Sequence, residues 1–163
     1  MSEVLDLIYL TITQLVITWV LIGIMWFSQV VHYPLYKKIK EGFVEYERSH
    51  IRRAALLIGP IMVIEAITAF FLVGAAPGGT LATLAGVNLI LLILIWLSTF
   101  LFQITLHQKL SIRFSPRVLR NLMTSNWVRT LLWTLKGVIM IFMIYHLFKL
   151  ETLGTKNLWS IIS

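Results

Sequence analysis

The 163-residue chain contains no cysteine, which excludes disulfide bonds and thiolate metal sites. Acidic residues are scarce, since seven Asp and Glu stand against fourteen Lys and Arg, for a formal net charge of +7. Charged residues make up only 13% of the chain, whereas hydrophobic residues make up 58% and the mean hydropathy is +0.86. A water-soluble domain needs a larger charged fraction than this. The composition therefore indicates a membrane protein.

Four long apolar stretches follow one another along the chain, and a transmembrane helix needs about 20 apolar residues. The stretches cover about residues 4–31, 54–73, 81–106 and 126–149. The first has no basic segment ahead of it, so we expect a retained span rather than a cleaved signal peptide. The predicted fold is all-α, a polytopic membrane protein with a four-transmembrane-helix bundle. Residues 1–163 form one membrane-embedded domain.

The basic residues lie mainly in two of the connecting segments, residues 32–53 and 107–125, whereas the turn at 75–80 is uncharged. The positive-inside rule therefore places both basic segments in the cytoplasm and both termini outside, with Lys156 as a minor exception. Membrane topology explains the net charge, so we expect no nucleic-acid partner. The first basic segment has apolar residues at helical spacing, from Leu35 to Tyr46, which predicts a short interfacial helix.

Glu65 is the most informative single residue, because about 18 Å of helix separates it from Arg53 at the α-helical rise. A carboxylate at that depth is a functional candidate. Lys136 lies deep enough in the last stretch to reach it. The two side chains can form a buried ion pair that fixes the packing of the bundle, or Glu65 can take up and release protons, and the sequence leaves both possibilities open. The Gly59-Pro60 pair also leaves open whether residues 43–73 form one helix.

Three histidines come to the cytoplasmic side of the predicted bundle: His32, His50 and His107. Glu47 precedes His50 by one helical turn, the spacing of the Glu-x-x-His pairs in di-iron bundles. These four residues are therefore candidate ligands of a divalent metal or, for the histidines, of haem b. The alternative is that each histidine lies at the membrane interface and binds lipid headgroups, backbone or water.

Each stretch also carries a narrow polar stripe at helical periodicity. Charged and polar side chains in a membrane should face the interior of the bundle. We therefore add four residues to the candidate cofactor site: Gln29, Trp96, Gln103 and Arg129. The alternative for the uncharged members is that they only join helices by hydrogen bonds, which contribute about 0.6 kcal/mol each.

Several short motifs resemble a family of uncharacterised bacterial four-span membrane proteins. They are WFSQVVHYPLY at the end of the first stretch, YERSHIRR before the second, and NWVRTLLW at the start of the fourth. More remotely, the first two stretches are similar to anthrone-oxygenase-like proteins and to the HemJ-type protoporphyrinogen oxidase. The first resemblance implies a multi-pass protein of the bacterial inner membrane, with its termini on the periplasmic side by the charge pattern. The second implies a haem-binding four-helix bundle with a histidine near the end of the first span.

Three functional hypotheses follow from these residues. The first is a haem or metal protein that carries out redox chemistry on a lipophilic small molecule, with Glu65 and Lys136 as candidate catalytic groups. The second is a non-enzymatic accessory or scaffold subunit of a larger membrane complex, with a partner subunit or a second copy beside it. The third is a small proton-coupled transporter or channel, suggested by the Glu65/Lys136 pair and the Gly59-Pro60 break.

Overall fold

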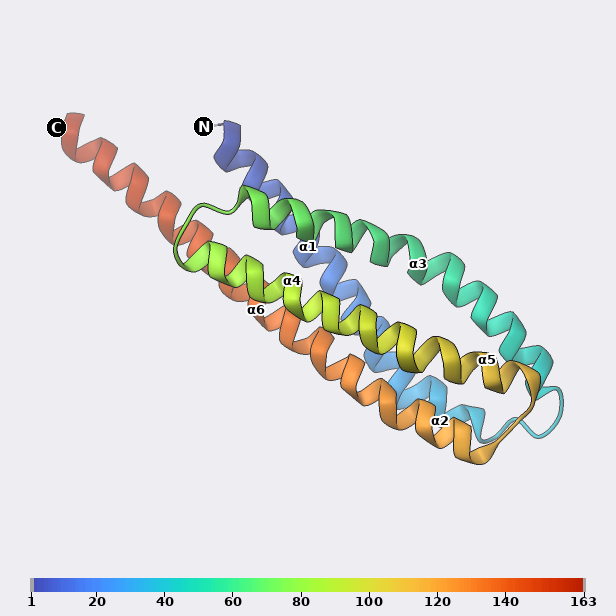
Figure 1. Cartoon of the computed structure of the whole chain (residues 1–163). Helices are drawn as coiled ribbons and strands as arrows, with labels where there is room; N and C mark the ends of the chain where they lie inside the picture. Colours follow the sequence, from blue (N-terminus) through green and yellow to red (C-terminus); the bar gives the residue numbers. More distant parts are fainter. Residues whose placement is uncertain (1, 163) are drawn as a thin grey trace.

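Four long helices form the molecule in a computed structural model that describes residues 2–162 and the side chains of residues 5–149 (Figure 1). The elements in chain order are α1 (Ser2–Phe27), the π-helix η1 (Ser28–His32), α2 (Tyr33–Tyr36), α3 (Phe43–Ala75), α4 (Thr80–Ser98), the π-helix η2 (Thr99–Ile104), α5 (Thr105–Ile112) and α6 (Pro116–Ile162). The four-helix fold prediction is confirmed. The four segments that are long and apolar enough to cross a membrane are Leu5–Tyr36, Phe43–Ala75, Thr80–Ile112 and Pro116–Lys149.

The helices extend well beyond the predicted apolar stretches 54–73 and 126–149. Residues 43–53 and 116–125, which we predicted as parts of basic segments, are the first turns of α3 and α6. Hydropathy marks the part of a helix that lies in hydrocarbon, whereas a helix can continue into the headgroup region, where basic side chains are solvated. Residues 43–73 belong to one continuous helix, because α3 runs through Pro60 without a break.

The connections at the basic end are short and have specific caps. The separate short helix predicted from Leu35 to Tyr46 is not present: Leu35 lies in α2, which follows η1 directly and ends at Tyr36, residues 37–42 are not helical, and Phe43 and Tyr46 belong to α3. Gly42 precedes α3 with a φ of 67°, a left-handed conformation that glycine adopts without steric cost. The Ser115 hydroxyl accepts from the Val118 amide at 3.5 Å, and Pro116 is the first residue of α6, where proline is favoured because its missing N–H is not needed.

Helices α1 and α4 each pack against both α3 and α6, so the order around the bundle is α1, α3, α4, α6. Three apolar clusters follow one another along the bundle. The first, at the basic end, contains Tyr33, Tyr36, Phe43, Leu110, Leu119 and Leu122. The second contains Leu21, Ile22, Met25, Met62, Ala69, Leu92, Ile95 and Trp133. The third, toward the termini, contains Leu7, Leu72, Leu81, Ala85, Met140, Met143 and Leu147.

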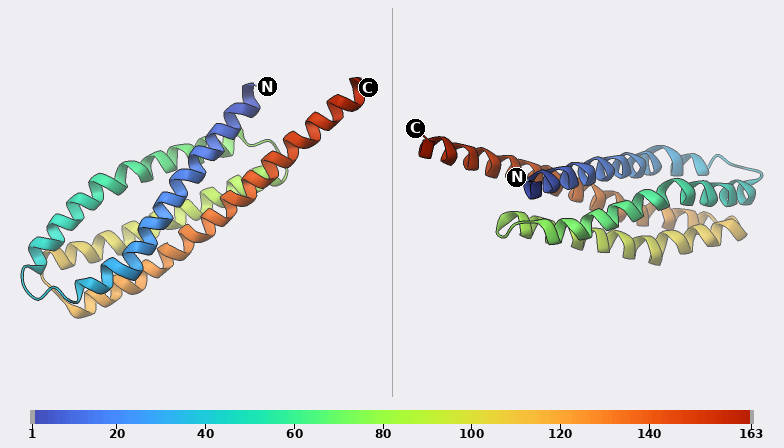
Figure 2. Two further views of the ribbon diagram at one scale, coloured as in Figure 1. Left: turned by 180° about the vertical axis from the view of Figure 1, so that it is seen from behind. Right: turned by 90° about the horizontal axis from the view of Figure 1, so that it is seen from above.

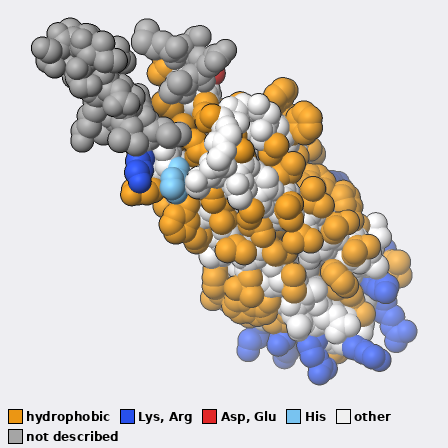
Figure 3. Space-filling model, turned by 60° about the vertical axis from the view of Figure 1, so that its left-hand side comes forward, with side chains coloured by type: hydrophobic (Ala, Val, Ile, Leu, Met, Phe, Trp, Pro, Cys, Tyr) orange, Lys and Arg blue, Asp and Glu red, His pale blue; other side chains and the backbone are white. Residues whose placement is uncertain are grey.

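The outer surface of the bundle is apolar over most of its length. Large side chains such as Leu56, Phe70 and Leu131 are more than half exposed. Figure 3 shows hydrophobic side chains over the body of the molecule, with most of the visible Lys and Arg gathered at one end. Both termini lie at the opposite end from the α2 and α5 connections, as the views in Figure 2 agree. This is the surface of a polytopic membrane helical protein with all its strongly basic connections on one side.

Candidate functional site at the basic end

The three predicted histidines come together at the basic end of the bundle. His32 ends η1, His50 lies in the first turns of α3, and His107 lies in α5. His32 Nε2 and His50 Nδ1 are 3.2 Å apart, so one imidazole donates to the other. The centroids of the His50 and His107 rings are 5.4 Å apart. Three helices therefore contribute one imidazole each to a single cluster.

Glu47 lies at the centre of this histidine cluster and is completely buried. Its Oε1 atom is 2.5 Å from His107 Nδ1. An ionised carboxylate only accepts hydrogen bonds, so His107 Nδ1 carries the proton. His107 Nε2, 3.3 Å from the Tyr33 hydroxyl, is then free to accept from it. The carboxylate thus fixes which nitrogen of His107 is protonated, and the tyrosine holds the other face of the ring.

Tyr36 links Glu47 to the other two histidines. Its hydroxyl is 3.2 Å from His32 Nε2 and lies close enough to the Glu47 carboxylate to interact with it. The contacts therefore run from His32 through Tyr36 toward Glu47, and His50 faces the same nitrogen of His32, Nε2, that faces Tyr36. From Glu47 the contact with His107 continues the series. His32 Nε2 either donates one proton or accepts one, so it serves His50 Nδ1 or the Tyr36 hydroxyl at a given time, and the cluster can hold a proton beside the Glu47 carboxylate.

A groove of about 500 Å³ lies on the surface of the bundle between α1 and α3 and ends at this cluster. Its polar lining consists of Ser28, His32, His50 and Arg53. The rest of the lining is Val20, Gly23, Ile24, Phe27, Ala54, Leu57 and Ile58. The two helices are antiparallel, so the polar groups share the basic end of the groove and the apolar ones extend toward the middle of the membrane. The groove therefore suits a molecule with an apolar body and a polar or anionic end.

The donor set of the cluster matches a first-row metal or haem iron in kind, because imidazole and carboxylate are their common ligands. Two nitrogen ligands on one tetrahedral zinc ion are about 3.3 Å apart, given Zn–N bonds near 2.0–2.1 Å. The 3.2 Å between His32 Nε2 and His50 Nδ1 is close to that separation. However, within residues 5–149 no group of three His, Asp or Glu side chains is arranged to hold a metal ion.

The other predicted cofactor residues lie deeper in the bundle than the histidines and at more than one level along it. Asn126 donates to Gln29 Oε1 at 2.8 Å, and Gln103 Nε2 donates to the Ser125 hydroxyl at 2.9 Å. Arg129 contacts Met25 Sδ at 2.7 Å. Trp96 Nε1 is buried without a hydrogen-bond partner. Gln29 and Gln103 each make a hydrogen bond to α6, which is the kind of contact that the alternative for these residues expects.

Glu65 and Lys136 meet in the middle of the bundle, where both side chains are completely buried. Thr18 completes the site, since its hydroxyl donates to Glu65 Oε1 at 2.6 Å and accepts from Lys136 Nζ at 3.2 Å. Lys136 Nζ also contacts the same carboxylate oxygen directly. The pair does not reach the histidine cluster, because the second apolar cluster lies between them along the bundle.

Tyr33 contacts the histidine cluster, although helical periodicity does not place it there. Adjacent residues His32 and Tyr33 would point about 100° apart in a regular α-helix, so only one was assigned to the polar stripe. In the structure both side chains contact the same cluster, because His32 faces His50 and Tyr33 faces His107.

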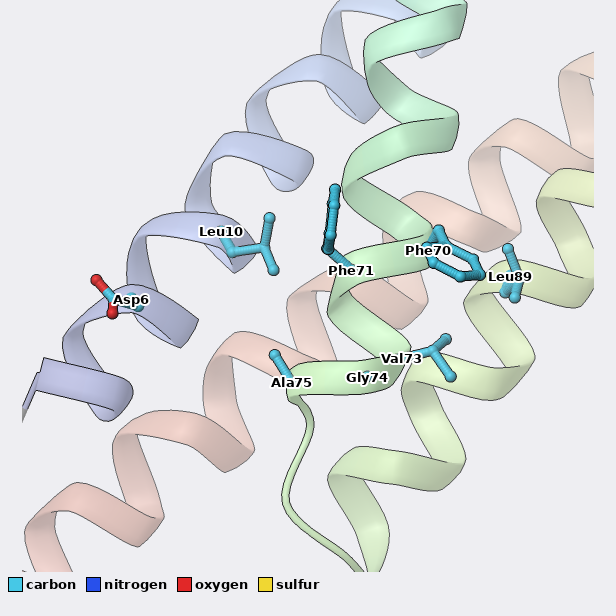
Figure 4. A pocket seen from close by; sticks show the side chains of 8 residues that line it. All are labelled: Asp6, Leu10, Phe70, Phe71, Val73, Gly74, Ala75 and Leu89. Carbon is cyan, nitrogen blue, oxygen red and sulfur yellow. The ribbon is translucent and has the colours of Figure 1, made fainter.

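Another groove, of about 680 Å³, lies near the opposite end between α1, α3 and α4 (Figure 4). Leu10 and Phe71 point toward each other across it, and Asp6 is the charged residue at its edge. The remaining lining is apolar, so it offers room for lipid chains and no polar group deep inside.

Comparison with protein-family models, with curated proteins and with solved structures finds no match for this chain.

Proposed function

We propose that the protein binds a lipophilic small molecule from the bilayer in the α1/α3 groove and transfers a proton to or from it through the histidine cluster. The observation that carries this proposal is that His32 and His50 line the groove and are also 3.2 Å apart in a series that leads to Glu47. The apolar part of the groove would hold the body of the molecule. Arg53 at its basic end would hold an acidic or polar head.

The chain's residues then have distinct roles in this proposal. His32 and His50 would exchange the proton with the bound molecule, since both line the groove. Tyr36 would connect them to the Glu47 carboxylate, and Glu47 would stabilise the positive charge that the imidazoles acquire. His107, held by Glu47 and Tyr33, would keep that carboxylate in place.

A redox form of the proposal adds a haem or a divalent metal at His32, Glu47, His50 and His107, which would supply a site for electron transfer. Its support is the kind of donor and the separation of the His32 and His50 nitrogens. The remote resemblance to haem-binding bundles adds to it. The proton transfer described above does not depend on such a group.

Binding is tested with 11-(dansylamino)undecanoic acid, a fluorescent fatty acid, on protein purified in mild detergent. Gly23 lines the groove and has nothing within 4 Å of an added Cβ, so Gly23→Leu fills the groove without a clash at Cβ. We expect saturable fluorescence enhancement that Gly23→Leu weakens by at least about tenfold. Gly86→Leu, also in open space and outside the groove, is the matched control. Equal binding by wild type and Gly23→Leu would rule out the groove.

The redox form is tested by absorption spectra of the oxidised and the dithionite-reduced protein, together with metal analysis. A Soret band that shifts on reduction and disappears in His32→Ala or His50→Ala would support it. A spectrum with only the tryptophan band and no bound metal would remove haem and metal from the proposal. The orientation proposed from the charge pattern places this site on the cytoplasmic side, which protease or labelling access to the basic connections checks.

A second candidate function is proton passage across the membrane, favoured by the contact of Glu65 with Lys136 and Thr18 in the middle of the bundle. An intramembrane ion pair is characteristic of ion and proton pathways. Proteoliposomes with an internal pH dye test it. Proton flux that Glu65→Gln abolishes would support this function, and the absence of any such flux would dismiss it.

A further inference from the structure

We propose that Arg129 is the centre of a binding site for an oxyanion, a carboxylate or phosphate group, inside the bundle. Its side chain is only 8% exposed and lies in α6 in a membrane-spanning segment. Arginine is almost never buried without an anionic partner, because burying its charge is costly. The contacts of Arg129 show no such partner.

The buried charges elsewhere in the bundle are already neutralised. Lys136 pairs with Glu65, and Glu47 pairs with His107. Within the described side chains, Arg129 has no carboxylate oxygen within 4.0 Å. The hydrogen bond of its Nη2 goes to Met25 Sδ, and a thioether sulfur is a weak acceptor. The Nε atom is buried without any partner.

A guanidinium has five N–H donors in a planar fork that matches a carboxylate or a phosphate. Most of these donors are unused at Arg129. The indole Nε1 of Trp96, which packs against the same apolar cluster as Met25, is a second buried donor without a partner. Asn126 Oδ1 and Gln103 Oε1 are unpartnered acceptors in the adjacent layer, suited to water molecules around a bound group. Arg129 supplies a positive charge, and Arg129 and Trp96 both supply unpartnered donors. These features identify the ligand as an anion.

The two π-helical segments point to the same level of the bundle. Gln29 of η1 bonds to Asn126, one turn before Arg129, and Gln103 of η2 bonds to Ser125. π-Helical turns are uncommon and occur frequently at functional sites. Here two of the four helices carry one, on opposite sides of α6. They surround the layer that contains the unpaired arginine.

The anion has two sources that share this chemistry: a free ion from the aqueous phase, or the head of an amphipathic molecule. This inference does not depend on the proposed function, because Arg129 is not part of the α1/α3 groove. Arg129 lies close enough to Tyr33 to interact with it electrostatically, so an anion bound there would lie on the inner side of the histidine cluster.

The test is the melting temperature of the full chain in detergent, followed by tryptophan fluorescence because the chain has no cysteine for thiol dyes. The probes are acetate, inorganic phosphate and decanoate, at constant ionic strength set with chloride, and decanol is the neutral control. Arg129→Met removes the charge and keeps the length of the side chain. Arg129→Lys keeps the charge and loses the fork. Arg120→Met is the matched control, since Arg120 is exposed in the same helix.

We expect at least one oxyanion to raise the melting temperature of the wild type and of Arg120→Met, while decanol does not. Arg129→Met should weaken the apparent affinity by at least about tenfold, the typical effect of losing a charged hydrogen bond. Stabilisation by acetate or phosphate identifies a free ion, and stabilisation by decanoate alone identifies an amphipathic head. The same response in Gly23→Leu shows that the site is separate from the groove.

Two results would overturn the inference: no oxyanion stabilises the wild type, or Arg129→Met responds as the wild type does. If Arg129→Met does not fold, Arg129→Lys decides, since an unaltered affinity in that variant would contradict recognition by the guanidinium fork. Failure of the fluorescent fatty acid to bind would leave these results untouched, so the two proposals fail separately.

Discussion

Lys136 and Arg129 are two buried cations on one helix, two turns apart, in opposite environments. Lys136 contacts a carboxylate and a hydroxyl, both buried, whereas Arg129 contacts a thioether sulfur. The first region is a charge-balanced site that joins α1, α3 and α6, with one carboxylate oxygen, Glu65 Oε2, left without a hydrogen bond. The second carries a charge that nothing in the described bundle balances nearby. The comparison indicates that Lys136 stabilises the packing of helices, whereas Arg129 is available to bind an anionic ligand.

The largest effect is expected from breaking the pair of Glu65 and Lys136. Glu65→Leu leaves Lys136 charged and alone in the bundle interior, which should lower the free energy of unfolding by about 3–5 kcal/mol. The double variant Glu65→Leu/Lys136→Leu removes both charges and should recover most of that loss. Thermal unfolding in detergent, followed by tryptophan fluorescence, measures both. A double variant no more stable than Glu65→Leu would show that the two charges do not stabilise each other.

Glu47→Gln probes the other buried carboxylate, the one that holds His107. The amide oxygen can still accept from His107 Nδ1, but the charge is lost, so we expect a stability loss of about 1–3 kcal/mol. Glu45→Gln, on an exposed residue of the same helix, is the matched control and should be nearly neutral. Equal melting temperatures for the two variants would mean that the contact of Glu47 with His107 is not stabilising.

The pairing of Glu65 with Lys136 could be predicted from sequence, because both residues lie on polar stripes of apolar helices at similar depth. The meeting of His32, His50 and His107 followed from topology in the same way. The contacts of Arg129 and Tyr33 could not be predicted. Met25 is an apolar residue with no polar signal, and Tyr33 would point about 100° away from His32 in a regular α-helix.

Helix boundaries show a similar division. Apolar content located the four helices, since burial in hydrocarbon dominates their composition. It could not locate their ends, because the first turns of α3 and α6 carry basic side chains that are solvated outside the hydrocarbon. Glu47 and His50 lie in one of these turns. The histidine cluster therefore lies outside the apolar stretches that hydropathy identifies. The packing of α3 against α5 brings Glu47 and His50 to His107.

Arg129→Met, measured without any oxyanion, tests whether Arg129 contributes to stability in the way that Lys136 does. Because no carboxylate is stranded by the change, we expect the free energy of unfolding to fall by less than about 1 kcal/mol or to rise. Methionine also packs well beside Met25 in an apolar cluster. The measurement is the same thermal unfolding in a buffer with chloride as the only anion. A loss as large as that of Glu65→Leu would show that Arg129 has a strong partner within the protein.

Gly137→Ala should also have a small effect, and it tests whether close packing of α1 and α6 holds the Lys136 site. An added Cβ would meet Ile22 Cδ1, while the Trp19 ring lies 3.6 Å away. The end of the Ile22 side chain can move, so we expect a loss of about 1 kcal/mol rather than unfolding. Gly59→Ala, with nothing within 4 Å, is the control and should be neutral or slightly stabilising, because alanine favours the helix.

Combining Gly137→Ala with Glu65→Leu/Lys136→Leu tests whether the close packing and the ion pair depend on each other. If tight packing serves to bring Lys136 to Thr18 and Glu65, the cost of Gly137→Ala should be smaller once the charges are gone. An identical cost in both backgrounds would mean that the two features stabilise the bundle independently.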